Sequence, residues 1–516
     1  MDAPEGPEAE TVLRLSGITK RFGTLVANDA ISLSLKRGEV VALLGENGAG
    51  KTTLMNILFG HYTADEGEIE VFGKPLPAGD PNAALGAGIG MVHQHFTLAD
   101  QMTVLENIVL GTQSLWSFNL GKARARAKIR ELATDYGLEV DPDRMITELS
   151  VGERQRVEIL KALYREARIL ILDEPTAVLT PMETEALFAT LQKLVAAGLS
   201  VIFISHKLGE VQSVSDRVVV LRGGKLAGER ATSEATRREL AELMVGGQLP
   251  VNEIGPSTPR DVLFELRSVS TPSMGGAALR QVSMQLRGGE ITGLAGISGN
   301  GQAALAALIA GTLEAREGEI IVHGAPAGRW SPRAALDRGL GRIPEDRHAT
   351  GMIGDMSVAE NVISEAYRSP RFSRFGFLDW KAAAAFADDI IKAYDVKCPS
   401  ADARVRLLSG GNMQKLILGR ALDGDPDIIL ASQPTRGLDV GAIAYVHARL
   451  IEARDRGAAV LLISEDLDEI QTLSDRILVI HRGQLSKPSL RGERSVMELG
   501  ELMAGHGVEE GAPHAA

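Results

Sequence analysis

The stretch Gly45-Glu46-Asn47-Gly48-Ala49-Gly50-Lys51-Thr52-Thr53 decides the fold of this chain. It follows the apolar run Val40 to Leu44, which predicts a buried parallel strand. It precedes Leu54, Ile57 and Leu58, whose spacing predicts one face of a short helix ended by Gly60. This order is typical of a phosphate-binding loop, and the flanking strand and helix disfavour the plainer interpretation, a glycine-rich turn.

Each residue type in this stretch has a role in holding phosphate. Gly45, Gly48 and Gly50 allow the tight turn that points backbone N–H groups at phosphate oxygens. The helix N-terminus adds a partial positive charge. Lys51 is expected to reach the outer phosphates, and the Thr52 hydroxyl to take a Mg2+ coordination position.

Composition indicates a globular protein of several domains in a reducing compartment. The 516 residues suggest two or more domains, and the net charge of -12 argues against broad nucleic-acid binding. The single cysteine, Cys398, cannot form an internal disulfide and is most simply a small apolar residue. Residues 1–10 lack the apolar core of a secretory signal, and no apolar run is long enough to span a membrane. The cytoplasm is therefore the expected location.

The chain contains an internal repeat whose period is half its length. Gly38-Glu39 recurs as Gly289-Glu290, and Leu149-Ser150 recurs as Leu408-Ser409. Glycines and prolines gather where the two copies meet, which is typical of a linker. We therefore expect domains at 11–246 and 262–505, a linker at 247–261 and a disordered tail at 506–516.

Within each copy, apolar strand-like runs alternate with helical segments, which predicts an α/β fold with a parallel sheet covered by helices. Residues 124–136 are charged with an apolar face and predict a helix inserted into this core. The run 168–172 predicts a buried strand that delivers Asp173 and Glu174 at its carboxyl end. There Asp173 is expected to hold Mg2+ through water, and Glu174 to orient or deprotonate the attacking water. The plainer alternative is that Asp173 and Glu174 lie in an exposed turn and have no catalytic role.

The motif Leu149-Ser150-Val151-Gly152-Glu153 precedes this acidic pair, and with it the chain resembles the ATP-binding subunit of an ABC transporter, whose signature is Leu-Ser-Gly-Gly-Gln. The resemblance implies two P-loop domains in tandem, each with an antiparallel β subdomain and an inserted helical subdomain, and it implies ATP and Mg2+ as cofactors. It assigns Gln94 to the loop that senses Mg2+ and faces the membrane partner, His206 to the switch that contacts the γ-phosphate, and Phe22 to adenine stacking. Lys51, Gln94, Glu174 and His206 are then the expected catalytic residues.

Two of these positions have plainer readings. His93 and His95 flank Gln94 at a spacing that could indicate a metal site, but no cysteine or acidic group supports one, and loop histidines are favoured. Phe22 could be a core residue instead of a stacking residue.

The second copy has lost most of this chemistry while keeping its glycines. Its loop reads Gly296-Ile297-Ser298-Gly299-Asn300-Gly301-Gln302-Ala303, so that Gln302 stands for the lysine and Ala303 for the hydroxyl. The other departures, in chain order, are Ser273 for Phe22, Glu345 for Gln94, Ser432 for Asp173, Gln433 for Glu174 and Glu465 for His206. Its signature, Leu408-Ser409-Gly410-Gly411, and its D-loop with Asp439 nevertheless stay close to the family pattern, whereas the first copy has Val151 and Thr180 there.

The substituted positions follow a pattern when the two domains are paired head to tail, as the domains of this family are. In that pairing each ATP lies between the phosphate loop of one domain and the signature of the other. The first loop would then face Ser409, Gly410, Gly411 and Asp439, and this site has every residue of the family pattern. The second loop would face Val151 and Thr180, and every one of these positions in that site departs from the family pattern. We therefore expect one hydrolysing site and one site that binds ATP weakly or not at all.

The resemblance further implies an importer ATPase at the cytoplasmic face of the membrane, working with two permease subunits and an extracytoplasmic substrate-binding protein. Residues 96–107 and 347–361 are where the family docks the coupling helices of the permease. The motifs around Gln94, Gln302 and Glu345 are closest to nucleoside importers, with simple-sugar importers as the alternative.

Alternatives of another class are a soluble ABC protein that acts on ribosomes or DNA and a regulatory module that does not hydrolyse ATP. The short linker, the degenerate copy and the single cysteine disfavour ribosomal and DNA-repair types, and Glu174 disfavours the regulatory module.

Overall fold

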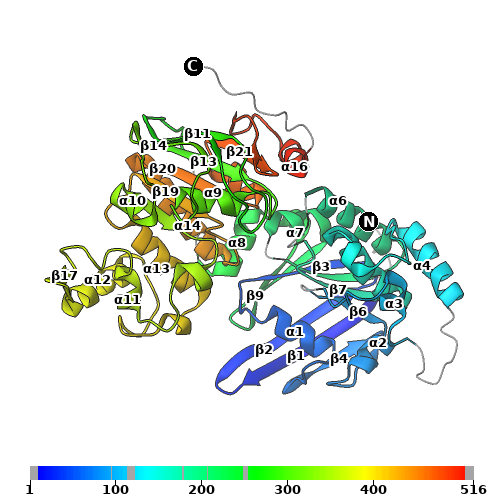
Figure 1. Cartoon of the computed structure of the whole chain (residues 1–516). Helices are drawn as coiled ribbons and strands as arrows, with labels where there is room; N and C mark the ends of the chain where they lie inside the picture. The colour runs from blue at the N-terminus through cyan, green and yellow to red at the C-terminus, as the bar shows by residue number, and fades with distance from the viewer. Residues whose placement is uncertain are drawn as a thin grey trace, which may run out of the picture. The chain divides into compact units, whose positions relative to one another are not determined.

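The computed structural model describes residues 10–93, 96–112, 122–176, 179, 181–205, 207–247 and 254–505. The chain divides into two compact units, Met1–Leu249 and Pro250–Ala516. The two units share most of their order of strands and helices, in blue to green for the first unit and in green to red for the second (Figure 1). The expected α/β fold with two similar lobes in tandem is therefore confirmed.

The first unit is built on a sheet whose central strands run parallel. The strand order is β10-β9-β3-β8-β7-β6, and all pairs are parallel except β10 with β9. The strand bounds are β3 Val40–Gly45, β6 Ile89–Val92, β7 Ile169–Asp173, β8 Ser200–Ile204, β9 Arg217–Arg222 and β10 Lys225–Ala231. Every residue of β3, β7 and β8 is buried, which is the burial expected of a parallel sheet covered on both faces.

Two further parts complete the first unit. An antiparallel sheet of order β2-β1-β4-β5 comprises β1 Thr11–Phe22, β2 Leu25–Lys36, β4 Glu66–Val71 and β5 Lys74–Pro75. The helical insertion contains α3 Val104–Val109, α4 Lys122–Tyr136 and α5 Val151–Tyr164, which pack on one another. The remaining helices are α1 Lys51–Leu58, α2 Pro81–Gly86, α6 Pro181–Ala196, α7 Leu208–Val214 and α8 Arg237–Val245. The predicted helix over 124–136 is therefore confirmed as α4.

The second unit repeats this plan. Its main sheet has the order β16-β19-β20-β13-β21-β22, with β16, β19, β20, β13 and β21 parallel. These strands are β13 Glu290–Ala295, β16 Leu340–Ile343, β19 Ile428–Ser432, β20 Ala459–Ser464, β21 Arg476–His481 and β22 Gln484–Leu485, and β23 Ser489–Leu490 pairs with β21. The antiparallel sheet contains β11 Val262–Ser270, β12 Val282–Arg287, β14 Glu317–Val322 and β15 Ala325–Pro326.

The helical insertion of the second unit is built from three helices and a short hairpin. It contains α11 Val358–Ile363, α12 Trp380–Ala393 and α13 Gly410–Leu422, and a short antiparallel hairpin, β17 Ser373–Arg374 with β18 Phe377–Leu378, precedes α12. The other helices are α9 Gln302–Ile309, α10 Pro332–Asp337, α14 Val440–Arg456, α15 Leu467–Leu473 and α16 Val496–Ala504, and a π-helical turn spans Arg347–Gly351.

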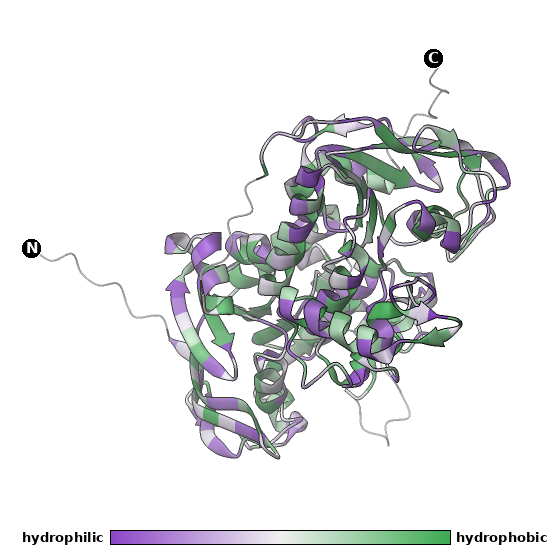
Figure 2. Cartoon of the chain, turned by 90° about the vertical axis from the view of Figure 1, so that its left-hand side faces the viewer, coloured by the Kyte–Doolittle hydropathy of each residue, from purple (hydrophilic) through white to green (hydrophobic). Residues whose placement is uncertain are grey.

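The apolar side chains of each unit gather in two layers, one between the main sheet and the antiparallel sheet and one under the helical insertion. Central strands are hydrophobic, and the helices that cover them carry hydrophilic outer faces (Figure 2). In the described part of the chain, no helix combines the length and the apolar character that crossing a bilayer requires.

Candidate active site

The phosphate-binding loop of the first unit joins the buried strand β3 to helix α1. Gly50 precedes the helix with φ of +98°, and a Cβ atom there would collide with the carbonyl oxygen of Ala27. Only glycine combines that backbone conformation with so close an approach. The predicted strand and helix on either side of the loop are therefore both present, with the helix beginning at Lys51.

Lys51 is buried inside this loop, with 6% of its surface exposed. Its Nζ donates to the carbonyl oxygens of Gly45, at 2.6 Å, and Glu46, at 3.0 Å. Burial lowers the pKa of the Lys51 ammonium, while the carboxylates of Glu174, Asp173 and Glu46 act in the opposite direction. The ammonium is therefore held inside the loop whose backbone N–H groups are predicted to bind phosphate.

Asp173 ends β7 and lies close to this lysine. Burial and the neighbouring Glu174 carboxylate raise the pKa of Asp173 to about 6, against the opposing charge of Lys51. Adjacent carboxylate oxygens at the end of a buried strand, beside the Lys51 ammonium, are the kind of hard oxygen ligands that Mg2+ prefers. With the buried Lys51 and the open glycine loop, this donor set fits a nucleotide phosphate together with Mg2+.

Glu174 sits in a strained backbone conformation, with φ of +47°. Its N–H donates to the carbonyl oxygen of Ile204, the last residue of β8, at 2.9 Å. Gln433 in the second unit has φ of +46° and makes the same bond to Ile463, at 2.8 Å. Both units therefore have the same left-handed backbone conformation at this position, which is occupied by a carboxylate in the first unit and by an amide in the second.

Other predicted residues are placed less completely. Gln94, His95, Thr180 and His206 lie outside the described residues. Thr52 is exposed at the start of α1 and Asn47 at the tip of the loop, while Ala49 is buried and Thr53 half-buried. Phe22 is 44% exposed and meets Tyr62 edge-on, with ring centroids 5.6 Å apart. It is therefore a surface aromatic, and Tyr62 is a second candidate for base stacking that sequence reasoning missed.

A half-buried carboxylate that sequence reasoning also missed joins the acidic motif to the residue that precedes the switch position. Glu210 on α7 accepts hydrogen bonds from Thr176 Oγ1, at 2.6 Å, and Ser205 Oγ, at 3.0 Å. Thr176 lies two residues after Glu174, and Ser205 lies immediately before His206. The signal available in the sequence was the equivalent Thr435 and Glu469, whose side chains are bonded at 2.7 Å in the second unit.

In the second unit, Gln302 takes over the contact of the lysine. Its Nε2 donates to the carbonyl oxygen of Ile297, at 2.8 Å. The side chain is 9% exposed, and its Oε1 finds no hydrogen-bond partner among the described residues. The loop therefore keeps its shape around a neutral amide, without the charge that attracts phosphate.

Carboxylates stand beside this second loop. Glu465 is hydrogen-bonded to Ser298, and burial raises its pKa, with Glu345 acting in the same direction and Arg436 against it. Glu345 forms an ion pair with Arg436, at 2.6 Å. The expected excess of negative charge is therefore present but partly compensated by one arginine of the same unit.

The two signature helices begin differently. At α5, Ser150 Oγ accepts from the N–H of Glu153, and the Glu153 carboxylate accepts from the N–H of Ser150 at 2.7 Å, which completes a capping box. Burial acts against ionisation of Glu153, but these hydrogen bonds and Arg144 outweigh it and lower its pKa. At α13, Ser409 Oγ accepts instead from the N–H and the Nδ2 of Asn412. The first signature therefore carries an anion at its helix N-terminus, and the second carries a neutral amide.

Arg347 lies against the second signature. Its Nη1 donates to the carbonyl oxygen of Arg436, at 2.9 Å, and a Cβ atom on Gly410 would meet its guanidinium at 3.1 Å. Asp439 caps α14 by accepting from the N–H of Ala442, at 2.8 Å. Arg347 thus connects the signature to the D-loop within the second unit, a role that its position beside Glu345 and Asp346 did not predict.

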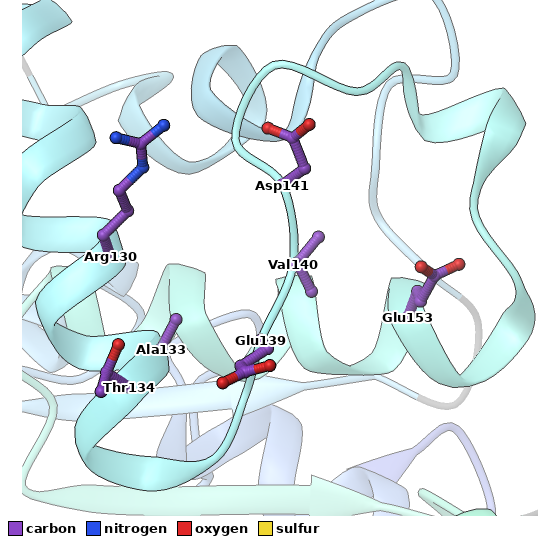
Figure 3. A pocket seen from close by; sticks show the side chains of 7 residues that line it. All are labelled: Arg130, Ala133, Thr134, Glu139, Val140, Asp141 and Glu153. Carbon is purple, nitrogen blue, oxygen red and sulfur yellow. The ribbon is translucent and has the colours of Figure 1, made fainter.

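A cavity of about 370 Å³ lies beside the first signature. It is shallow, and the charged ends of Arg130, Asp141 and Glu153 stand apart instead of meeting at one point (Figure 3). Within the described ranges no group of three or more histidine, cysteine or acidic side chains could hold a metal ion by itself. Neither observation adds a second ligand site to the phosphate loop.

Comparison with known proteins agrees with this geometry. The model of the family described as "ABC transporter" matches residues 28–177 and 279–436. The chain is 47% identical over 97% of its length, and 99% of the relative, to "Nucleoside import ATP-binding protein NupA" of Lactococcus lactis subsp. cremoris. It is 44% identical to "Glucose import ATP-binding protein TsgD13" of Haloferax volcanii, over 96% of both chains. It is 43% identical to "Guanosine import ATP-binding protein NupO" of Bacillus subtilis, over 97% of this chain and 99% of that one. The chain therefore belongs to the ABC transporter family, as one of its ATPases that bind ATP and Mg2+.

Proposed function

We propose that this chain is the ATP-hydrolysing, energy-coupling subunit of a nucleoside importer. The observation that carries the proposal is the near full-length similarity to NupA, together with a complete set of hydrolysis residues in the first unit only. We assign the two ATP-binding domains to 11–246 and 262–505, the linker to 247–261 and a disordered tail to 506–516. A simple-sugar importer is the second candidate, because TsgD13 is nearly as similar as NupA.

The chemistry rests on the first phosphate loop and the second signature. In this proposal, Lys51 and the loop N–H groups hold the phosphates, while Thr52, Asp173 and Gln94 hold Mg2+, which neutralises charge that develops on the phosphates. Glu174 orients or deprotonates water, with His206 beside the γ-phosphate. Ser409, Gly410, Gly411 and Asp439 close the site from the other domain.

The local geometry of each unit supports this assignment. The second loop has a neutral Gln302 and the nearby Glu465, and the first signature has Glu153 at the N-terminus of its helix. An anion at a helix N-terminus uses the N–H groups and the partial charge that phosphate would need. A pair formed by these two elements is therefore unsuited to ATP, and the complementary pair is suited to it.

ATP binding then joins the two domains, and hydrolysis releases them, which makes a ligand-driven two-state switch. We propose that two integral-membrane permease subunits use this motion at the cytoplasmic face of the membrane, and that an extracytoplasmic binding protein delivers the substrate. No residue of this chain is expected to contact the transported molecule.

The test is a reconstituted complex of this chain with its permease subunits and binding protein in vesicles. ATP turnover should rise with nucleosides and stay at its basal rate with glucose or ribose. Stimulation by a sugar alone would replace the first candidate with the second. Copurification with ribosomes in place of permease subunits would overturn both.

A further inference from the structure

The hairpin β17–β18 of the second unit exposes large aromatic side chains. Phe375 is 92% exposed and Phe377 is 80% exposed, and Trp380 at the start of α12 is 53% exposed. In Figure 1, β17 lies at the outer end of the yellow segment that carries α11 and α12. This group, Phe375, Phe377 and Trp380, is called the aromatic tip below.

The fold does not explain the residue at the turn of this hairpin. Arg374 pairs with Phe377, so the two turn residues are Phe375 and Gly376, with φ of +54° and +85°. A two-residue turn with both φ values positive favours Asn-Gly, because asparagine tolerates the left-handed conformation and bulky side chains do not. Phe375 therefore strains the backbone and gains almost no burial, which points to a role outside the folded unit.

The base of the hairpin is firmly held. Phe372 is 1% exposed, and its ring lies 5.2 Å from that of Phe386 on α12. The N–H of Asp379 donates to the carbonyl oxygen of Phe372, at 2.9 Å, and the Asp379 carboxylate caps α12. The aromatic tip is therefore presented on a packed support.

The surroundings of the tip are basic, although the whole chain carries a net charge of -12. Residues 367–381 contain one acid, Asp379, and four bases, Arg368, Arg371, Arg374 and Lys381. The guanidinium of Arg374 lies 5.8 Å from the centre of the Phe375 ring, and that of Arg368 lies 5.3 Å from the Tyr367 ring. Arg371 is engaged by Asp423, at 3.5 Å.

We propose that the aromatic tip and its arginines bind the anionic surface of the lipid bilayer. Aromatic rings concentrate at the headgroup level of membranes, and basic side chains are attracted to anionic lipids. A cytoplasmic permease loop fits less well, because such loops carry an excess of lysine and arginine and would repel this patch. The proposal rests on the proposed function, since it needs the chain to work at the membrane.

The tip is also connected to the region where coupling to the permease is expected. Residues 347–361 include the start of α11, and α11 packs against α12, which carries the base of the hairpin. A hairpin bound to lipid would therefore restrain the helical insertion beside the expected docking site.

The experiment is co-sedimentation of the full chain with vesicles of phosphatidylcholine alone and of phosphatidylcholine mixed with phosphatidylglycerol. The wild-type chain should sediment only with the anionic vesicles, and less so when NaCl rises from about 0.1 to about 1 M, which shortens the screening length from about 10 to about 3 Å. Phe375→Asn/Phe377→Ser should lower the bound fraction at least fivefold, and Arg368→Gln/Arg374→Gln should do the same at low salt. Phe375→Asn suits the turn, so that loss of binding would not reflect unfolding.

Leu490→Ser, at a residue that is 53% exposed in the same unit, is the matched control and should bind like wild type. Basal ATP turnover of the free chain should be unchanged in all variants, which separates this proposal from the proposed function. Equal vesicle binding by the tip variant and wild type, or no binding by wild type, would overturn the proposal. So would tip variants that bind vesicles normally but lose the permease subunits in detergent, since the surface would then belong to the permease.

Discussion

Thr176 Oγ1 lies 2.6 Å from Oε2 of Glu210, and this hydrogen bond ties the loop that carries Glu174 to helix α7. The same carboxylate oxygen accepts from Ser205, which directly follows the buried strand β8. One half-buried acid thus holds the two segments on which the water-activating residue and the switch histidine are predicted to stand. The contacts of Glu210 with Thr176, Ser205 and Lys207, whose Nζ lies 3.3 Å from its other oxygen, are all with residues of these two segments, so we assign it a positioning role.

Glu210→Gln should lower kcat for ATP hydrolysis by roughly tenfold, equivalent to about 1.4 kcal/mol, with little change in KM. Glutamine keeps the shape but weakens two hydrogen bonds to a charged acceptor. Glu469→Gln is the matched control, because Glu469 accepts the equivalent bond from Thr435 beside an acidic motif that has become Ser432-Gln433. Similar losses of kcat in both variants would indicate a purely structural role.

Lys51→Ala should abolish ATP turnover, with a loss of about a hundredfold or more, since one preorganised charge at the reacting phosphate contributes about 2.7–4 kcal/mol. Gln302→Ala, at the equivalent position of the second loop, should leave turnover within about twofold of wild type. Nucleotide binding measured by calorimetry should show one strong site that Lys51→Ala removes. Two strong sites in the wild type would contradict the assignment.

Ser409→Ala should reduce turnover far more than Ser150→Ala. Both changes remove a helix N-cap of about 1 kcal/mol, so their effects on thermal stability should be similar. Only Ser409 is proposed to bind the γ-phosphate, so turnover separates the two variants where stability does not. An equal loss of activity in both would show that ATP is not shared in the proposed crosswise manner.

Glu465→Gln should raise the melting temperature of the second unit at neutral pH. The folded-state pKa of Glu465 is raised above its ordinary 4.5, first by partial desolvation of a side chain that still reaches solvent and then by Glu345, so the ionised carboxylate weakly destabilises the fold, and this destabilisation disappears as the pH falls through the raised pKa. The gain should therefore be largest near pH 7.5 and absent near about pH 4. Glu501→Gln, on α16 and outside the second phosphate loop, is the control for the removal of one negative charge from the same unit.

The repeated motifs in the sequence predicted the two lobes. The sequence also predicted the strand β3, the helix α4 and the positions at which the second copy departs from the family pattern. These features are local in sequence, because a glycine loop or a buried strand is encoded by adjacent residues. The sequence could also predict that Lys51, Asp173 and Glu174 belong to one site, since parallel strands end at the same edge of a sheet.

Other features could not be predicted, because they depend on side chains that meet only after folding. Glu210 is distant in sequence from Thr176, and the turn conformation of Phe375 depends on how β17 pairs with β18. The pairing of Glu345 with Arg436, and of Arg347 with the D-loop, likewise joins segments that are far apart in the chain.

The sequence by itself determined the family, the two-lobed α/β plan and the loss of a lysine and of paired acids from the second copy. Only the tertiary structure decided how individual side chains are held: Gln302 inside its loop, Glu153 across a helix N-terminus, and Phe375 exposed on a strained turn. The physical reason is that residue type specifies which groups are present, whereas burial, backbone conformation and partner distance specify what those groups can do.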